Sequence, residues 1–288
     1  MEPVRFTVPS GAHPRLVAAL LAARPGLRPG QALSALRRRD VRVNGAKVQQ
    51  DRQLAAGDMV EAFLPPSPPP PLVYRDERVV IADKPPGLPV CDSRSGEATL
   101  RQWLEGALGQ PVYPLHRLDH HTSGLVAFAL TPQAQADLLP AFRDGRAHKR
   151  YRCLVKGFPP PEGDCRAYLL KEAKYATVRI YAQPHGTAKP IHTRFWVLEH
   201  RGDMSLLEVE LLTGRTHQIR AHLAFLGYPV AGDDKYGDRA FNRAHRLARQ
   251  QLRAVSLRFE GLPEPYGALN RSFSAPAEGL LAATEQGS

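Results

Sequence analysis

The chain has 288 residues, enough for one large domain or for a large domain and a small one. Hydrophobic residues make up 43% of it, but it contains no run of 18 apolar residues, and its first residues, MEPVRFTVPSG, hold no apolar signal core. We therefore expect neither a membrane span nor secretion. The net charge of +11 and the pI of about 9.9 indicate a polyanionic partner, nucleic acid before membrane.

The cysteines and arginines of the chain indicate the compartment and the class of ligand. Cys91, Cys153 and Cys165 have no Cys-x-x-Cys spacing, which is typical of packed thiols in a reducing cytoplasm. Of the 39 basic residues 31 are Arg, a side chain that binds phosphate with two parallel hydrogen bonds and stacks on bases. A coding bias toward Arg, Ala and Pro would also explain the share of Arg, but it explains the excess of positive charge less well.

Residues 1–64 read as a small basic unit. They hold ten Lys or Arg and five Asp or Glu, a net charge of +5. Leucines at helical spacing predict a helix around 16–21, and a second helix is expected over 29–39. Two short strands should surround Asn44-Gly45, because Asn-Gly is the strongest short hairpin signal, and a further strand is expected over 59–64.

This arrangement resembles the RNA-binding domain named after ribosomal protein S-four. The RVNG hairpin and the LAAGD turn at 54–58 carry the resemblance, which covers most of 14–64. The sequence departs from the pattern at Val17, where an acidic residue usually follows the opening Arg-Leu. A basic dimerisation or linker domain is the alternative. RNA binding by this unit would make its basic side chains candidate phosphate contacts, namely Arg28, Arg37, Arg38, Arg39 and Lys47.

A proline-rich linker, PPSPPPP at 65–71, separates this unit from residues 72–288, because it can continue neither a helix nor a central strand. In the larger part, strands are expected at 78–83, 125–130, 151–156, 176–181, 193–199 and 205–211, and helices at 99–108, 133–142 and 215–226. Strands outnumber helices and several are adjacent in sequence. The expected fold class is therefore α+β, with a mixed, largely antiparallel sheet.

The segment HRLDHHTSGL at 116–125 concentrates the chemistry of the chain. Its histidines and aspartate are ligand types for a transition metal, but a turn would splay them and there is no helical His-x-x-x-His pair. Ser123 lacks the Gly-x-Ser-x-Gly elbow of a nucleophilic serine, and caps a turn more readily. The third reading is that Asp119 acts as a carboxylate held at the start of a strand.

Two other segments are candidates to converge on Asp119. Ala147 to Arg152, AHKRYR, opens a strand, and LTGRTHQIRAH at 212–222 turns at Gly214 into a helix. Arg220 lies beside the apolar stripe of that helix, where it could reach inward. A buried arginine near Asp119 would keep the carboxylate ionised as a nucleophile or base, whereas a surface ion pair is the structural alternative.

Four blocks, in order, resemble the RluA family of pseudouridine synthases, and the resemblance spans about 73–275. The blocks are DKPPGLPV at 83–90, HRLDHHTSGL, Lys149-Arg-Tyr151 and LLTGRTHQIRAH at 211–222, followed by GDDKYG at 232–237. The resemblance implies that a uridine already within RNA is detached at N1, turned and rejoined through C5. Such a reaction oxidises nothing and imports no group, so we expect no cofactor and no metal.

The resemblance also implies roles for individual residues. Asp119 is the expected catalytic carboxylate, acting as a nucleophile or by abstracting a proton to form a glycal. Tyr151 should stack on the flipped base and is a candidate carrier of the C5 proton. Arg220 should pair with Asp119, and Ile219 should pack near the base. Arg117 should face the RNA and enter the space that the base vacates.

The remaining motif residues are expected to be structural. Lys84-Pro-Pro-Gly87 predicts a turn near the site. His116 should support the loop, and His120 and His121 should face solvent or RNA.

The expected protein is a cytoplasmic monomer that acts on RNA. Ribosomal RNA of the large subunit is favoured, because family members with such an N-terminal unit often act there, and transfer RNA is the alternative. A non-catalytic RNA-binding assembly factor and a metal-dependent hydrolase remain rival readings.

Overall fold

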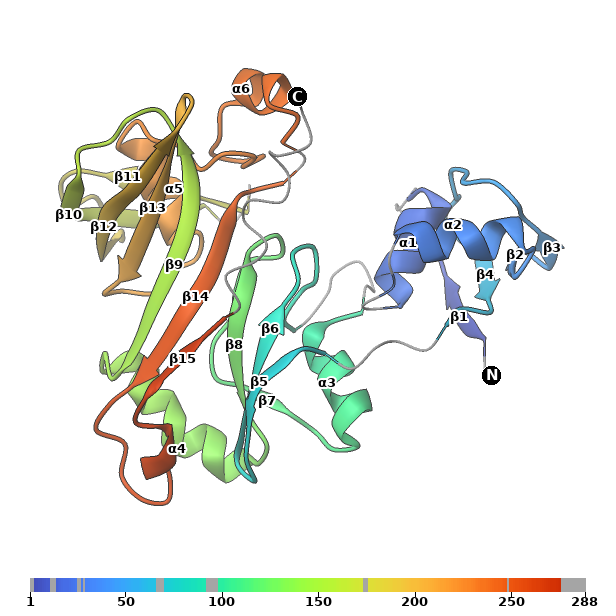
Figure 1. Ribbon diagram of the computed structural model, residues 1–288, viewed down its shortest axis with the longest axis horizontal. Helices are drawn as coiled ribbons and strands as arrows, with labels where there is room; N and C mark the ends of the chain where they lie inside the picture. The colour runs from blue at the N-terminus through green and yellow to red at the C-terminus, as the bar shows by residue number, and fades with distance from the viewer. Residues whose placement is uncertain are drawn as a thin grey trace.

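The fold contains two separate β-sheets. The computed structural model describes residues 3–10, 14–24, 27, 29–65, 70–91, 98–172, 176–247 and 249–275. The smaller sheet is built from the N-terminal part of the chain, and the larger one from everything after the proline-rich segment (Figure 1). Residues 66–69 of that segment lie outside the described residues, and the domain boundaries stay a prediction.

The N-terminal sheet has the strand order β1-β4-β2-β3 and is covered by two helices. Its elements are β1 (Val4–Thr7), α1 (Leu16–Ala23), α2 (Pro29–Arg37), β2 (Val41–Val43), β3 (Ala46–Lys47) and β4 (Met59–Ala62). The predicted hairpin is confirmed, because β2 and β3 pair around Asn44 and Gly45, whose φ angles of 52° and 81° belong to the tight turn that Asn-Gly favours. A cluster of buried residues between 8 and 64 forms a core of its own.

The large sheet has eleven strands within the described residues and is mostly antiparallel, as expected from the sequence. The strands of its main path, in chain order, are β5 (Leu72–Arg75), β6 (Val79–Lys84), β8 (Ser123–Ala129), β9 (Ala147–Lys156), β10 (Glu162–Glu172), β11 (Thr177–Tyr181), β12 (Lys189–Arg201), β13 (Met204–Leu211) and β14 (Leu252–Phe259). In space they follow the order β11-β10-β12-β13-β9-β14-β8-β6-β5, with β7 (Tyr113–Pro114) against β8 and β15 (Ser272–Ser274) against β14. Only β14 and β8 pair in parallel in this part of the chain, so the α+β class is confirmed.

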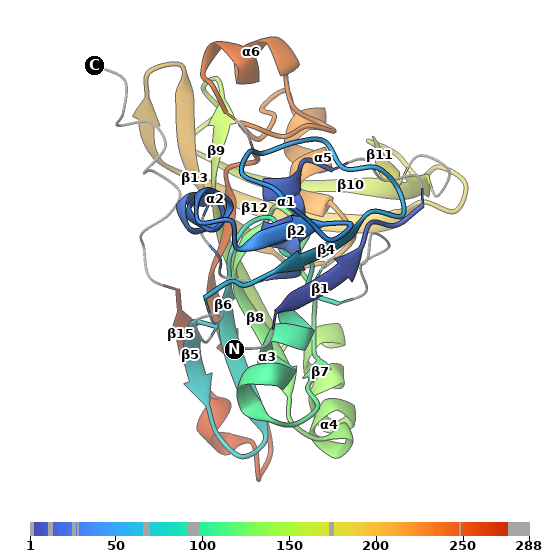
Figure 2. The ribbon, with the colours of Figure 1, turned by 90° about the vertical axis from the view of Figure 1, so that its right-hand side faces the viewer.

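The helices cover parts of this sheet. They are α3 (Leu100–Leu108), α4 (Pro132–Arg143), α5 (Gln218–Phe225) and α6 (Arg239–Ala244). Figures 1 and 2 show α3 and α4 near the β5–β8 end of the sheet, and α5 against the strands from β10 to β13. Ile219 and Leu223 of α5 pack with Tyr151, Leu207 and Val209 in one buried cluster. The catalytic candidates of β9 and α5 therefore share a core.

Several predicted bounds were wrong. The helix expected from 215 begins at Gln218, because His217 has the left-handed backbone conformation that precedes it. The helix expected to reach 39 ends at Arg37, and Arg39 likewise has a positive φ of 63°. Strands β10 and β14 were not predicted at all. No helix among the described residues is long and apolar enough to cross a membrane.

Candidate active site

A cleft of about 1030 Å³ opens beside the strands of the large sheet. Four segments far apart in sequence line it, namely 89–91, 114–120, 142–151 and 210–216. Basic side chains dominate its charged lining, contributed by Arg117, Arg143, His148, Lys149 and Arg215, while Asp119 and Glu210 are the acidic ones. A polyanion is the ligand class that this lining suits.

Asp119 lies in a tight turn that leads into β8. The amide of Thr122 donates to the Asp119 carbonyl, and the Thr122 hydroxyl accepts from Gln250 at 2.6 Å. Gly124, with φ 107°, approaches the backbone of Ala254 so closely that any Cβ there would overlap it. Only glycine fits this contact, which explains the Ser-Gly step of the motif. The turn holds the carboxylate of Asp119 at the cleft with 24% of its side chain exposed.

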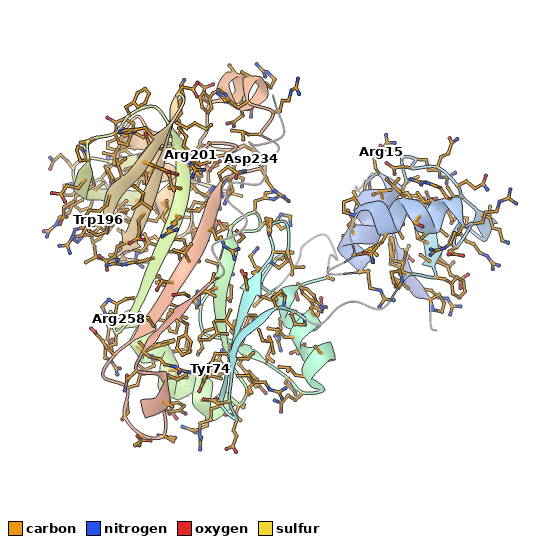
Figure 3. All side chains as sticks on the ribbon, in the orientation of Figure 1. Arg15, Tyr74, Trp196, Arg201, Asp234 and Arg258 are labelled. Carbon is orange, nitrogen blue, oxygen red and sulfur yellow. The ribbon has the colours of Figure 1, made fainter. Side chains whose placement is uncertain are left out.

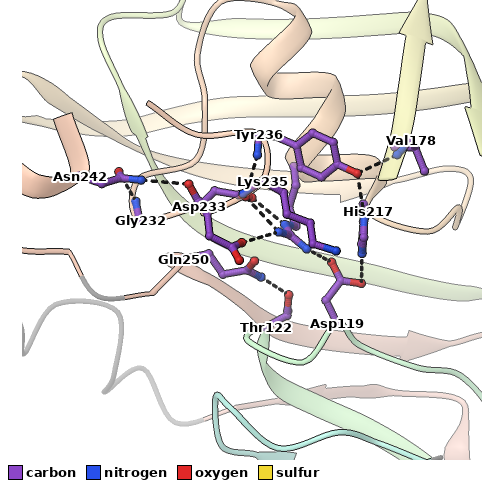
Figure 4. A network of polar contacts seen from close by, with 12 residues as sticks. Asp119, Thr122, Val178, His217, Gly232, Asp233, Lys235, Tyr236, Asn242 and Gln250 are labelled. Atoms are coloured by element: carbon purple, nitrogen blue, oxygen red, sulfur yellow. Dashed lines mark hydrogen bonds and ion pairs between the residues drawn. The ribbon is translucent and has the colours of Figure 1, made fainter. Parts of the chain in front are cut away.

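Arg220 of α5 meets this carboxylate. Its Nη1 donates to Asp119 Oδ2 at 3.0 Å, while its Nε and Nη2 donate to Asp233 at 2.6 and 3.0 Å (Figure 4). Asp233 is fully buried, and Asp234 lies 3.4 Å from the same guanidinium. Burial lowers the pKa of Arg220, but the hydrogen bonds and charges of Asp233 and Asp119 outweigh it and raise the pKa overall. The arginine is therefore a fixed cation beside Asp119.

His217 and Tyr236 complete the network on the other side of Asp119. His217 Nε2 lies 4.0 Å from Asp119 Oδ1, and His217 Nδ1 lies 2.8 Å from the Tyr236 hydroxyl. That hydroxyl accepts the amide hydrogen of Val178 at 2.9 Å (Figure 4). The Tyr236 ring also lies 5.3 Å from the guanidinium carbon of Arg220. The 232–237 segment thus contacts both neighbours of Asp119.

Tyr151 forms part of the cleft wall and is 5% exposed. Burial raises the pKa of its phenol, and the charge of Asp119 raises it further. Ile219 packs in the same buried cluster as Tyr151 and is not among the described residues that line the cleft. Arg117 is exposed at the cleft. The structure thus brings Asp119, Tyr151 and Arg220 together, with Arg117 at the same cleft.

The Lys84 segment forms a structural turn, as predicted. Lys84 is fully buried, and its Nζ donates to three carbonyl oxygens, those of Pro85, Leu88 and His120, at 2.8–3.0 Å. Burial lowers the pKa of Lys84 to about 7, although the negative charges of Asp119 and Asp83 raise it. The lysine ties the turn to the residue that follows Asp119.

The three motif histidines differ. His116 is half-buried and accepts the amide hydrogen of Ala127 at 3.2 Å, and desolvation lowers its pKa to about 3, which suits a neutral support for the loop. His120 is exposed and contacts the Gly87 carbonyl at 2.9 Å. His121 is half-buried, and its placement toward RNA stays a prediction. Within the described segments, no three His, Cys, Asp or Glu side chains gather as metal ligands would.

The N-terminal candidates lie away from this cleft. Arg37, Arg38 and Arg39 are exposed at the end of α2, and Lys47 is exposed on β3. Arg38 pairs with Asp40 at 2.8 Å. Arg28 lies outside the described residues. Figure 3 marks the separation, with Arg15 on the N-terminal unit and Asp234 beside the active-site network.

Asp233, His217 and Tyr236 are site residues that the sequence reasoning missed. In the sequence, GDDKYG reads only as a loop that follows the motif blocks, and His217 only as part of the LLTGRTHQIRAH block. Gly232 and the residues after it predict a turn, but no local pattern marks Asp233 as a buried partner of Arg220.

A carboxylate held by a buried arginine, in a cleft lined by basic groups on an α+β sheet, defines an enzyme that handles a polyanion. The chain belongs to the RNA pseudouridylate synthase family, whose sequence profile matches residues 78–225. It is a pseudouridine synthase of the RluA type that its motifs resemble.

Named relatives agree on this class. An "Uncharacterized RNA pseudouridine synthase" of Chloroflexus aurantiacus is 41% identical over 62% of this chain, and the match spans 55% of that protein's length. "Ribosomal large subunit pseudouridine synthase C" of Vibrio cholerae is 33% identical over 78% of each chain. "tRNA pseudouridine synthase C" of the same organism is 36% identical over 65% of this chain and 84% of its own.

A solved structure shares the fold. "Human RNA Pseudouridylate Synthase Domain Containing 1" superposes with a TM-score of 0.61 at 28% identity, over 72% of this chain and 83% of that one.

Proposed function

We propose that this protein isomerises specific uridines of structured RNA to pseudouridine, with Asp119 as the catalytic carboxylate and large-subunit ribosomal RNA as the substrate. The observation that carries the proposal is the contact at 3.0 Å between Arg220 and Asp119. Arg220 is itself clamped by the buried Asp233 and pairs with one oxygen of Asp119, whose carboxylate lines a basic cleft.

The proposed chemistry needs only the side chains at this cleft. The target uridine leaves its stack, at a cost of a few kcal/mol, and Arg117 fills the gap. Asp119 attacks the sugar or takes a proton from it, and the N1 bond of the base breaks. The base turns and rejoins the sugar through C5, C5 loses its proton while N1 gains one, and any proton that Asp119 took returns to the sugar. No oxidation state changes and no group is imported, so the reaction balances without a cofactor.

Tyr151 is proposed to stack on the flipped base and then to accept the C5 proton. Its buried ring forms part of the cleft wall. The charge of Asp119 raises the pKa of the phenol. That charge is lost once Asp119 has bonded to the sugar or taken a proton, so the phenol then ionises more readily, and its phenolate is the form that can accept the C5 proton.

Ribosomal RNA is preferred over transfer RNA because a larger share of this chain aligns with the ribosomal relative. The Vibrio cholerae ribosomal enzyme aligns with 78% of this chain, and the transfer-RNA enzyme of that organism with 65%. The additional matched length supports a substrate shared with the ribosomal enzyme. Transfer RNA remains the second candidate, since both kinds of relative match.

The N-terminal unit is proposed to hold RNA in the manner of the S-four type. Two helices, an Asn-Gly hairpin and the exposed arginines at the end of α2 support this role. Arg37, Arg38, Arg39 and Lys47 are the described candidates for phosphate contacts, and Arg28 is a fifth from the sequence.

Pseudouridine mapping in total RNA tests the proposal. A strain without the gene should lack pseudouridine at one or more positions of large-subunit ribosomal RNA. Wild-type protein should restore them, and Asp119→Asn should not. Missing sites confined to transfer RNA would overturn the choice of substrate. An unchanged pseudouridine map would contradict the function itself.

A further inference from the structure

Asp119 has a second nitrogen within reach besides that of Arg220. His217 Nε2 lies 4.0 Å from Asp119 Oδ1, whereas Arg220 Nη1 binds the other oxygen, Oδ2. Only 14% of the His217 side chain is exposed. A gap of 4.0 Å is too long for a hydrogen bond, but contacts at enzyme sites often shorten when substrate binds.

Tyr236 decides which nitrogen of His217 carries the hydrogen. The Tyr236 oxygen accepts the amide hydrogen of Val178, which leaves its own hydroxyl hydrogen for His217 Nδ1 at 2.8 Å. A neutral imidazole has one donor and one acceptor nitrogen. We therefore assign the acceptor to Nδ1 and the N–H to Nε2, the nitrogen that faces Asp119.

One short segment places both donors. Asp233 Oδ1 accepts from the amides of Lys235 and Tyr236 at 2.9 and 3.0 Å, and from Arg220 Nη2 at 3.0 Å. The carboxylate that clamps Arg220 thus also shapes the turn that carries Tyr236. Gly237 packs against the carbonyl of Asp233 so closely that a Cβ would overlap it. The segment 232–237 is therefore a rigid support for Arg220 and His217 together.

The backbone at His217 is held in an uncommon conformation. Its φ of 54° lies in the left-handed region, which is strained for a residue with a Cβ. The buried Gln218 holds this turn, because its Oε1 accepts from Thr213 Oγ1 and from the Arg215 amide at 2.9 and 3.0 Å. Such strain persists only where neighbouring contacts impose it, and it concentrates at functional sites.

We propose that His217 is a positioning residue whose Nε2–H points to Oδ1 of Asp119, the oxygen that Arg220 does not bind. The hydrogen bond from Tyr236 to Nδ1 keeps the hydrogen of His217 on Nε2. Two donors on different oxygens fix the plane of the carboxylate. His217 occupies one lone-pair direction of Oδ1 and leaves the other for the ribose. The inference rests on the proposed function, because it assigns a partner to the proposed catalytic carboxylate.

Single-turnover tritium release from RNA with 5-tritiated uridine, at saturating enzyme, tests the inference. His217→Leu removes both ring nitrogens and should lower the rate roughly 10-fold to 100-fold, the value of one hydrogen bond to a charged group. RNA affinity, measured by fluorescence anisotropy, should change less than about threefold, since the donor acts on Asp119 rather than on phosphate. His217→Gln keeps an N–H and an acceptor and should recover most of the rate.

A double-mutant cycle separates positioning from structure. Tyr236→Phe should slow wild-type protein but should have no further effect in the His217→Leu background, because Tyr236 acts through His217. If Tyr236 had only a structural role, Tyr236→Phe would lower the rate by the same factor in wild type and in the His217→Leu variant. His185→Leu is the matched control, since His185 is an exposed histidine that stacks on Tyr181, outside the described cleft lining, and its rate should equal that of wild type.

The outcomes distinguish the inference from the function on which it rests. Wild-type protein that releases no tritium from any RNA would overturn the proposed function and the inference with it. Active wild type, with a folded His217→Leu variant of unchanged rate or with additive losses in the cycle, would overturn the inference alone.

Discussion

Arg220 is buried between carboxylates of very different exposure. Asp233 is fully buried, Asp119 is 24% exposed, and Asp234 is 68% exposed. A buried guanidinium needs a partner that cannot be replaced by water. Asp233 therefore determines stability, whereas Asp119 can be changed while Arg220 keeps its two bonds to Asp233.

Asp→Asn substitutions at the three positions, compared by chemical denaturation, should rank Asp233, Asp119 and Asp234 by their contributions to the free energy of unfolding. Asp233→Asn leaves a buried cation without its counter-charge and should lower the free energy of unfolding by about 3 kcal/mol. Asp119→Asn should cost less than about 1 kcal/mol, and Asp234→Asn should fall within about 0.5 kcal/mol of wild type. Equal losses at all three positions would contradict the assigned roles.

Tyr151 should show two separable roles. Tyr151→Phe keeps the aromatic face and should bind RNA like wild type, but its single-turnover rate should fall about 100-fold, as expected for loss of a general base. Tyr151→Ala should in addition weaken binding by about 1–3 kcal/mol, the value of stacking one base. A Phe variant with wild-type turnover would assign the ring to stacking alone.

Sequence reasoning reached part of the site at the scale of single residues. A buried arginine near Asp119 was expected from the position of Arg220 beside the apolar stripe of its helix, and the 3.0 Å contact bears this out. Asp233 and His217 were not expected. Asp233 reaches Arg220 through a loop fold that local patterns do not specify, and a left-handed histidine has no sequence signature.

At the scale of elements, helix α1 obtains its missing carboxylate from elsewhere. The sequence lacks an acidic residue at position 17, but Asp51 Oδ1 accepts the amide hydrogen of Val17 at 3.0 Å. Asp51 Oδ2 pairs with Arg15 Nε at 2.7 Å. A carboxylate at the first turn satisfies a free amide and complements the helix dipole. Asp51 therefore supplies the acidic group that position 17 lacks.

Asp51→Ala should loosen the start of α1. Loss of such a capping contact costs about 1 kcal/mol, and hydrogen exchange at Val17 should accelerate accordingly. Asp51→Asn keeps an oxygen acceptor, so its hydrogen-exchange rate at Val17 should lie between those of wild type and Asp51→Ala. Unchanged protection at Val17 in the Ala variant would show that Asp51 does not cap the helix.

The pH dependence of this contact has a definite sign. The Val17 amide, followed by Arg15, lowers the pKa of Asp51 below its ordinary 3.8. The contribution of Asp51 is therefore fully present above pH 3.8 and is lost as the pH falls through the lowered value in the folded state. Protection at Val17 should decline only in that acidic range.

Elements with strong local patterns were predicted, and those defined by distant pairing were not. Thr99 caps α3 with a capping box, and Thr131 caps α4, so both helices lie close to their expected bounds. Strand β10, EGDCRAYLLKE, carries charges along much of its length, and its pairing with β11 and β12 decides its structure. In β14 a bulge between Ala254 and Ser256 breaks the alternation that would mark a strand.

At the scale of the whole molecule, the order of strands could not be predicted from local sequence. Strand β14 comes from the C-terminal part of the chain, yet it lies between β9 and β8 in the centre of the sheet (Figure 1). This placement carries Gln250 to Thr122 and Arg253 to Asp83. Long-range pairing of this kind depends on the complete fold, so only the class of sheet was accessible beforehand.

The N-terminal arginines should contribute to RNA capture rather than to chemistry. Replacing Arg37, Arg38 and Arg39 together by Gln should reduce the log–log salt slope of RNA binding by about 2, at roughly 0.7 per lost phosphate contact. The single-turnover rate at saturating RNA should stay unchanged. Arg5→Gln is the control, because Arg5 lies on β1, at the opposite edge of the N-terminal sheet from β3, and is paired with Glu61. An unchanged slope in the triple variant would show that these arginines do not contact phosphate.

The central claim is that Asp119 performs uridine isomerisation, and tritium release from 5-tritiated uridine RNA tests it most directly. Wild-type protein and Asp203→Asn, a change in the turn between β12 and β13, should release tritium at equal rates. Asp119→Asn should release none above background while binding RNA within a few fold of wild type, because the amide has nearly the same shape but cannot act as a carboxylate. Substantial release by the Asp119→Asn protein would contradict the account.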